Sequence, residues 1–186
     1  MALTTIDPGS ALVVIDLQQG IVSAFDDPSV TAAVKQAAHL AAEFRRHGLP
    51  VVLVTVTGRA PGRTDAGRGG GAVPPGWADL VGELDAAPTD HLITKRRRSA
   101  FHDTGLDTLL RDLGVTQVVL AGISTSSGVE STARSASDHG YHVVLATDAM
   151  TDPDAEAHRH SVERVFPKLG ETATTAEIAD RIEATR

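Results

Sequence analysis

The sequence predicts an α/β protein whose doubly wound, mostly parallel sheet is covered by helices on both faces. Two observations support this fold class. Short runs of consecutive apolar residues alternate with longer segments whose apolar residues recur at helical spacing. Uninterrupted apolar runs are typical of strands that are buried on both faces, as in a parallel sheet between helices. Strand–helix–strand repetition then implies right-handed crossovers and an open sheet.

The elements are expected in the following order along the chain. Five apolar runs predict strands at residues 11–15, 51–56, 91–94, 117–121 and 143–146. Helical spacing predicts helices at residues 30–47, 106–113, 129–139 and 155–169. A short edge strand at 171–174 and a terminal helix at 176–184 complete the prediction. No linker interrupts the chain, so we expect residues 1–186 to form a single domain.

Composition excludes several classes of function. The chain has no cysteine, which excludes a disulfide scaffold, a thiolate zinc site, a CxxC redox motif and a thiol nucleophile. A net charge of -7 argues against nucleic acid or an anionic membrane as the main partner. No apolar run reaches the length of a membrane span, and no basic segment precedes the first apolar stretch as in a signal peptide. We therefore expect a soluble cytoplasmic globular protein.

Residues 58–75 (GRAPGRTDAGRGGGAVPP) are too rich in Gly and Pro to form the interior of a helix or strand. A loop of this length in a compact domain is usually functional or mobile. One interpretation is a substrate-covering loop in which Arg59, Arg63 and Arg68 bind an anion. The alternative is a surface excursion whose arginines are simply solvated.

Two charged residues follow strands of the predicted sheet. Open parallel sheets bind ligands outside the carboxyl ends of their strands. Asp16 directly follows the first strand, and Lys95 follows the third. Partial burial raises a carboxyl pKa unless a cation opposes it, and a carboxylate beside a lysine is a common acid/base unit. The alternative is a purely structural ion pair that joins two strand ends.

The fourth strand is followed by the small-residue run GISTSSG at residues 122–128. Small residues let a ligand approach the backbone, and a helix N-terminus offers N–H groups to a developing negative charge. We therefore take four residues as candidates for substrate binding: Ile123, Ser124, Thr125 and Ser127. The run contains no nucleophile-elbow motif, and the alternative is an ordinary cluster of helix-capping residues.

Aromatic side chains make up only 3% of the sequence, which makes Phe101 and Trp77 candidate walls of a pocket. Packing in the core is the alternative role for both. The eight histidines are dispersed, and none forms a metal-binding motif. We expect neither a metal nor a cofactor.

Three motifs together resemble the isochorismatase-like hydrolase superfamily, which also contains nicotinamidases and other amide hydrolases. These motifs are Asp16 in ALVVIDLQQG, Lys95 in TKRRRSAFHDTGLDTLL, and the run AGISTSSGVESTARSASDHGYHVVLATDAM. The similarity extends from about residue 10 to about residue 178. It implies a six-stranded parallel sheet in a three-layer α/β/α arrangement, a cis peptide bond between Ile123 and Ser124, and a homodimer or higher homo-oligomer.

The same resemblance assigns catalytic positions. Amide-cleaving members use an Asp–Lys–Cys triad, and here Gly128 occupies the position of the cysteine. The loss of the thiol removes covalent acyl-enzyme chemistry. Isochorismatases also carry Gly there and cleave a vinyl ether, for which Asp16 would donate the proton while Lys95 orients it. Two alternatives remain: an amidase-fold protein that binds a small molecule without turnover, and a hydrolase that cleaves amides with water directly.

Overall fold

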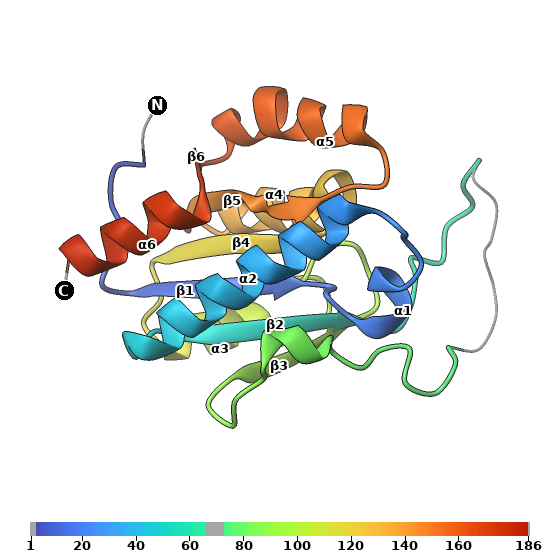
Figure 1. The fold of residues 1–186 in the computed structure, drawn as a ribbon, viewed down its shortest axis with the longest axis horizontal. Helices are drawn as coiled ribbons and strands as arrows, with labels where there is room; N and C mark the ends of the chain where they lie inside the picture. Colours follow the sequence, from blue (N-terminus) through green and yellow to red (C-terminus); the bar gives the residue numbers. More distant parts are fainter. Residues whose placement is uncertain (1–2, 66–72, 186) are drawn as a thin grey trace.

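A computed structural model describes residues 3–65 and 73–185. It contains a six-stranded sheet with the order β3-β2-β1-β4-β5-β6, in which every pairing is parallel (Figure 1). The strands are β1 (Ser10–Ile15), β2 (Val51–Val56), β3 (His91–Lys95), β4 (Gln117–Ile123), β5 (His142–Thr151) and β6 (Glu171–Ala173). The chain adds strands on one side of β1 and then on the other. The predicted fold class is therefore confirmed, with the switch in strand order between β1 and β4.

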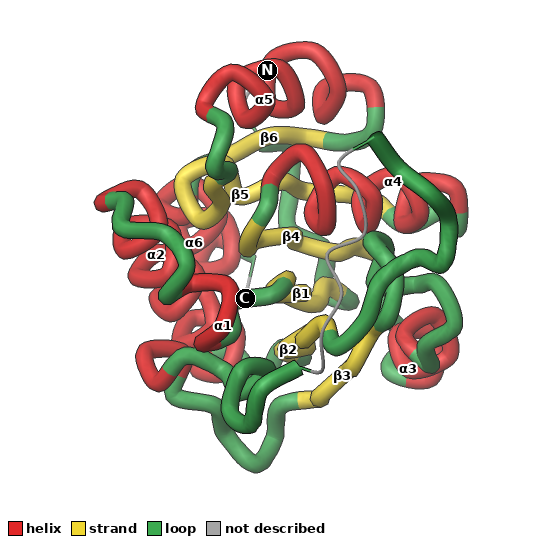
Figure 2. The backbone as a smooth tube through the Cα atoms, turned by 90° about the vertical axis from the view of Figure 1, so that its right-hand side faces the viewer, coloured by secondary structure: helices red, strands yellow, loops and turns green. Residues whose placement is uncertain are grey.

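Helices cover both faces of this sheet, so that the sheet and the two helical layers make up the predicted three-layer arrangement (Figure 2). The helix α2 (Pro28–Arg46) and the C-terminal α6 (Thr175–Ala184) lie on one face, and α3 (Leu106–Asp112) and α4 (Glu130–Asp138) lie on the other. The shorter helical elements are α1 (Gln19–Val22), α5 (Ala155–His160), the 3-10 turns η1 (Gly82–Leu84) and η4 (Phe166–Lys168), and the π-helical turns η2 (Thr125–Val129) and η3 (Ser161–Val165).

The sheet separates two hydrophobic cores. Along β1, Leu12 and Val14 point into the core beneath α2 and α6, whereas Ala11, Val13 and Ile15 point into the core beneath α3 and α4. Every residue of β1 is buried. Burial on both faces favours apolar residues at every position, which explains the uninterrupted runs in the sequence. The edge strand β3 differs, because Leu92 on its outer face is 69% exposed.

Most predicted elements agree with the structure to within two residues at each end, and two differ more than that. The helix expected at residues 155–169 is divided into α5, η3 and η4, and Pro167 lies in the first turn of η4. Proline has no N–H for the helical hydrogen-bond ladder, so a regular α-helix does not continue through it. Strand β5 is longer than expected and shifts its register against β4 between Leu120 and Gly122.

No helix within the two described ranges is both long enough and apolar enough to cross a membrane.

Gly122 allows β4 to pass close to β1, and its replacement tests this packing. Its φ is +124°, and an added Cβ would lie 2.0 Å from the carbonyl oxygen of Ile15. We expect Gly122→Ala to lower the free energy of unfolding by about 3 kcal/mol or more, because backbone of the central strand must move. Urea denaturation measures this loss. The control is Gly105→Ala, where a Cβ meets open space. Equal stability of the two variants would contradict the proposed packing.

Candidate active site

A cavity of about 820 Å³ lies at the carboxyl ends of β1, β2, β3 and β4. Asp16 enters it from the end of β1 and Lys95 from the end of β3. The run that follows β4 contributes Ser124, Ser127 and Gly128. The cavity therefore spans the switch point of the sheet, where the strand-end rule predicts a ligand site.

Asp16 and Lys95 form a buried ion pair. The Lys95 Nζ donates hydrogen bonds to Asp16 Oδ2 (2.8 Å) and to the carbonyl oxygen of Arg98 (2.7 Å). The two side chains are only 8% and 1% exposed, respectively. The other carboxyl oxygen, Asp16 Oδ1, is buried and has no hydrogen-bond partner among the described residues. One carboxyl oxygen is thus held by the lysine, and the other retains its capacity to accept a hydrogen bond.

Burial raises the pKa of Asp16 from 3.8 to about 6, although the charge of Lys95 and its hydrogen bond act in the opposite direction. A carboxyl group with a pKa near 6 exchanges its proton close to neutral pH. Asp16 is therefore suited to act as a general acid or a general base.

Gly128 lies beside this ion pair, at the position that the family resemblance gives to a nucleophile. A Cβ at Gly128 would lie 3.1 Å from Asp16 Oδ2 and 3.1 Å from Lys95 Nζ. The structure thus brings the three predicted catalytic positions together. The peptide bond between Ile123 and Ser124 is cis, as the resemblance implies. Ile123, Ser124 and Ser127 line the cavity, as predicted.

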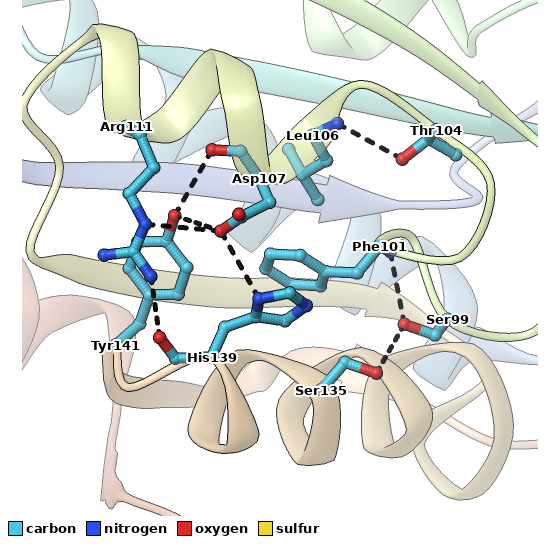
Figure 3. A network of polar contacts seen from close by, with 9 residues as sticks. All are labelled: Ser99, Phe101, Thr104, Leu106, Asp107, Arg111, Ser135, His139 and Tyr141. Carbon is cyan, nitrogen blue, oxygen red and sulfur yellow. Dashed lines mark hydrogen bonds and ion pairs between the residues drawn. The ribbon is translucent and has the colours of Figure 1, made fainter.

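Phe101 does not line the cavity, so of its two suggested roles, pocket wall and packing, the structure shows packing. Its ring stacks on His139 with centroids 5.0 Å apart and lies 5.9 Å from the ring of Tyr141 (Figure 3). The Tyr141 hydroxyl donates to the Asp107 carboxylate (2.7 Å), which also pairs with Arg111. Packing between α3 and the C-terminal end of α4 therefore determines the orientation of Phe101.

Thr125 and Trp77 also lie outside the cavity lining. Thr125 is buried, and its hydroxyl makes a 2.8 Å hydrogen bond with Nδ1 of His158. Trp77 packs on Gly20 of α1, where an added Cβ would lie 1.9 Å from the indole. Both side chains are used in packing beside the site.

Among the described residues, three arginines line the cavity, and the sequence interpretation named one of them, Arg59. Arg63 is not part of this lining, and Arg68 lies outside the described residues. The structure adds Arg97 and Arg98, which lie two and three residues after Lys95. Together with Lys95 the three arginines give the described part of the lining four cationic side chains and one acidic one, Asp16. The available signal was the basic run KRRR immediately after a predicted strand.

Gln18 is a further residue that the sequence interpretation missed. Its buried side chain accepts a hydrogen bond from the Val56 N–H (2.7 Å) and donates to the Val56 carbonyl (3.1 Å) and the Trp77 carbonyl (3.3 Å). One amide thus ties the end of β1 to the end of β2 and to the segment at Trp77. The available signal was a polar residue two positions after Asp16, at the end of an apolar strand.

Thr132 on α4 connects two parts of the site. Its buried hydroxyl donates to the carbonyl oxygen of Gly128 (2.7 Å) and accepts from the Ala100 N–H (3.0 Å). Ala100 lies two residues after Arg98, whose carbonyl oxygen holds Lys95. One hydroxyl therefore ties the turn of Gly128 to the segment that positions the lysine.

Among the described residues, one group of side chains has ligand atoms close enough together to hold a metal ion: Glu43, His47 and Glu183. Arg46 already pairs with both glutamates. The group belongs to α2, its C-terminal end and α6, and none of it lines the cavity.

Replacing Thr132 by Val tests the connection between α4 and Lys95. The change leaves the buried Ala100 N–H without its acceptor, and we expect the free energy of unfolding to fall by about 1–3 kcal/mol. Lys95 should also be held less closely to Asp16, so the pKa of Asp16 should rise above about 6. Carboxyl ¹³C NMR titration measures that pKa. Thr132→Ser keeps the hydroxyl and is the control; identical Asp16 titrations in both variants would refute the connection.

Comparison with known proteins agrees with this geometry. The sequence model of the isochorismatase domain family matches residues 10–177 of the chain. An isochorismatase family protein of Bacillus subtilis, YwoC, is 38% identical, with 93% of this chain and 94% of that protein covered. The maleamate amidohydrolase of Pseudomonas putida is 31% identical, with coverage of 88% and 82%. The solved structure of an isochorismatase family protein from Burkholderia thailandensis superimposes with a TM-score of 0.92 at 37% identity, covering 96% of this chain and 98% of that one. The chain therefore belongs to the isochorismatase family of hydrolases.

Proposed function

We propose that this hydrolase cleaves a small anionic molecule, such as an isochorismate-like vinyl ether, by acid–base chemistry at Asp16 and Lys95 without a covalent intermediate. The observation that carries the proposal is the buried Asp16–Lys95 pair beside Gly128, which has no side chain to act as a nucleophile. A carboxyl group with a pKa of about 6 retains a useful protonated fraction near neutral pH.

The proposed reaction begins with protonated Asp16. Asp16 gives its proton to the terminal carbon of the vinyl ether, and the ether oxygen stabilises the resulting oxocarbenium ion. Water then adds to the cationic carbon and returns a proton to the Asp16 carboxylate. The hemiketal that forms collapses to a carbonyl compound and an alcohol. Throughout, the Lys95 ammonium orients Asp16 and stabilises its ionised form.

The charges around the cavity support an anionic substrate. Arg59, Lys95, Arg97 and Arg98 outnumber Asp16, although the chain as a whole carries a net charge of -7. A cationic cavity in an acidic protein concentrates small anions at the site.

A second candidate reaction is the direct hydrolysis of an amide by water. The similarity to maleamate amidohydrolase favours it, because maleamate carries a carboxylate beside its amide. In that case ionised Asp16 would act as the base that activates the water. A binding module without turnover is less favoured, because it has no evident need for a buried carboxylate and ammonium. The homodimer and the cytoplasmic location expected from the sequence stay predictions.

The pH dependence of kcat/KM distinguishes these reactions. A screen of vinyl ethers and small amides, with pyruvate and ammonia as readouts, first identifies a substrate. If protonated Asp16 is the acid, kcat/KM should be constant at low pH and fall about tenfold per pH unit above pH 6. If ionised Asp16 is the base, kcat/KM should instead rise with pH and level off above about 6.

The variant Asp16→Asn belongs to the same experiment and should lose roughly two to four orders of magnitude in rate. The matched control is Asp112→Asn, at an exposed carboxylate outside the cavity. An Asp16→Asn enzyme that keeps most of the wild-type rate would show that the carboxylate is structural and would overturn the proposal.

Replacing Gly128 by Cys tests the position assigned to the missing nucleophile. The new thiol would lie beside Lys95, whose charge lowers a thiol pKa and favours the thiolate. We therefore expect Gly128→Cys to react with iodoacetamide at least about tenfold faster than Gly105→Cys, where the added side chain meets open space. The wild-type chain has no cysteine, so mass spectrometry reports this thiol alone. An inert thiol in the folded variant would place Gly128 outside the reactive site.

A further inference from the structure

We propose that Arg97 binds a carboxylate group of the substrate through the Nε–Nη2 edge of its guanidinium. The inference rests on the proposed function, because it takes the cavity around Asp16 as the substrate site. It goes further by assigning one residue to the recognition of one chemical group.

The guanidinium of Arg97 is fixed by the backbone on either side of it. Its Nη1 donates to the carbonyl oxygen of Arg59 (3.1 Å) and to the carbonyl oxygen of Arg96 (3.0 Å). These bonds join the segment after β2 to the segment after β3, and residues of both line the cavity. Arg97 is therefore held in place before a ligand arrives, which lowers the entropic cost of binding.

Both backbone bonds use the same nitrogen and leave the rest of the guanidinium to other partners. The remaining N–H groups are on Nε and Nη2, and their spacing matches the two oxygens of a carboxylate. Within the described part of the chain, no side chain or carbonyl bonds to these two nitrogens.

Arg45 binds a carboxylate of this protein through the same Nε–Nη2 edge of its guanidinium. Its Nε donates to Asp90 Oδ1 (3.0 Å) and its Nη2 to Asp90 Oδ2 (2.7 Å), which is a two-point bond to a carboxylate. Arg97 is half-buried like Arg45, yet it has no acidic partner among the described residues. A substrate carboxylate would supply the missing partner for a partly desolvated cation.

The other two arginines in the described part of the lining are suited to a less specific role. Arg59 and Arg98 are exposed, and their guanidinium groups make no hydrogen bond within the described ranges. Ordering such long side chains costs conformational entropy. They add positive charge that attracts an anion, whereas Arg97 provides a fixed geometry that recognises it.

A titration with benzoate and benzamide tests this assignment. The two probes have nearly the same shape, but only benzoate carries a carboxylate. Binding is followed by NMR, using the ¹⁵Nε–H signal of Arg97 and the backbone amides around the cavity. The wild-type protein should bind benzoate more tightly than benzamide, and benzoate should shift the Arg97 signal.

Variants then separate Arg97 from a general charge effect. Arg97→Gln should weaken benzoate binding roughly 10- to 100-fold. The affinity of Arg97→Lys should fall between those of Arg97→Gln and the wild type, because an ammonium provides charge without the two parallel N–H groups of the guanidinium edge. Arg164→Gln removes one exposed arginine outside the cavity and should bind benzoate like the wild type. Backbone amide spectra confirm that each variant is folded, and Arg97→Lys keeps the test valid if Arg97→Gln fails to fold.

Three results would overturn the assignment: equal affinity of the wild type for the two probes, unchanged benzoate binding in the Arg97 variants, or an equal loss in Arg164→Gln. The titration needs no turnover, so it is independent of the reaction at Asp16. An active Asp16→Asn enzyme together with weakened benzoate binding in Arg97→Gln would refute the proposed reaction and support the carboxylate site. An inactive Asp16→Asn enzyme together with unchanged benzoate binding in Arg97→Gln would refute only the carboxylate site.

Discussion

The ion pair between Asp16 and Lys95 is the interaction on which the rest of the site depends. A buried ammonium or carboxylate without a partner is strongly unfavourable, so each charge requires the other. The two residues come from strands that are not neighbours, because β2 lies between β1 and β3. Adjacent strands are about 4.8 Å apart, so a long side chain is needed to cross the end of β2. Lysine has that length, and the Arg98 carbonyl fixes the end of it.

Much of this arrangement could be predicted from the sequence. The apolar runs located the five longer strands, β1 to β5, and the strand-end rule together with the family resemblance located Asp16, Lys95 and Gly128 at one edge. These predictions succeed because strand burial and chain direction are properties of local sequence. The contact between Asp16 and Lys95 also depends on the order of strands, which local pattern does not contain.

The orientation of individual side chains could not be predicted in the same way. Phe101 follows the basic run closely in sequence, yet its ring turns to His139 because α3 and α4 meet there. The run KRRR likewise does not reveal which arginine the backbone holds, since the two carbonyls that fix Arg97 come from separate segments. Nor does a net charge of -7 describe the cavity, because the basic groups gather where several strand ends meet.

The hydrogen bonds of Gln18 have a consequence for how this scaffold can diversify. The side-chain amide of Gln18 donates to the carbonyls of both Val56 and Trp77, which lie at the two ends of the segment between them. Both ends of that segment are therefore anchored to the end of β1, whatever residues lie between them. Because loop-closure entropy grows only slowly with length, the residues between such anchored stems can be exchanged or lengthened at small thermodynamic cost. Evolution or laboratory selection can therefore change the mouth of the cavity through this segment while the sheet and its charged pair remain intact.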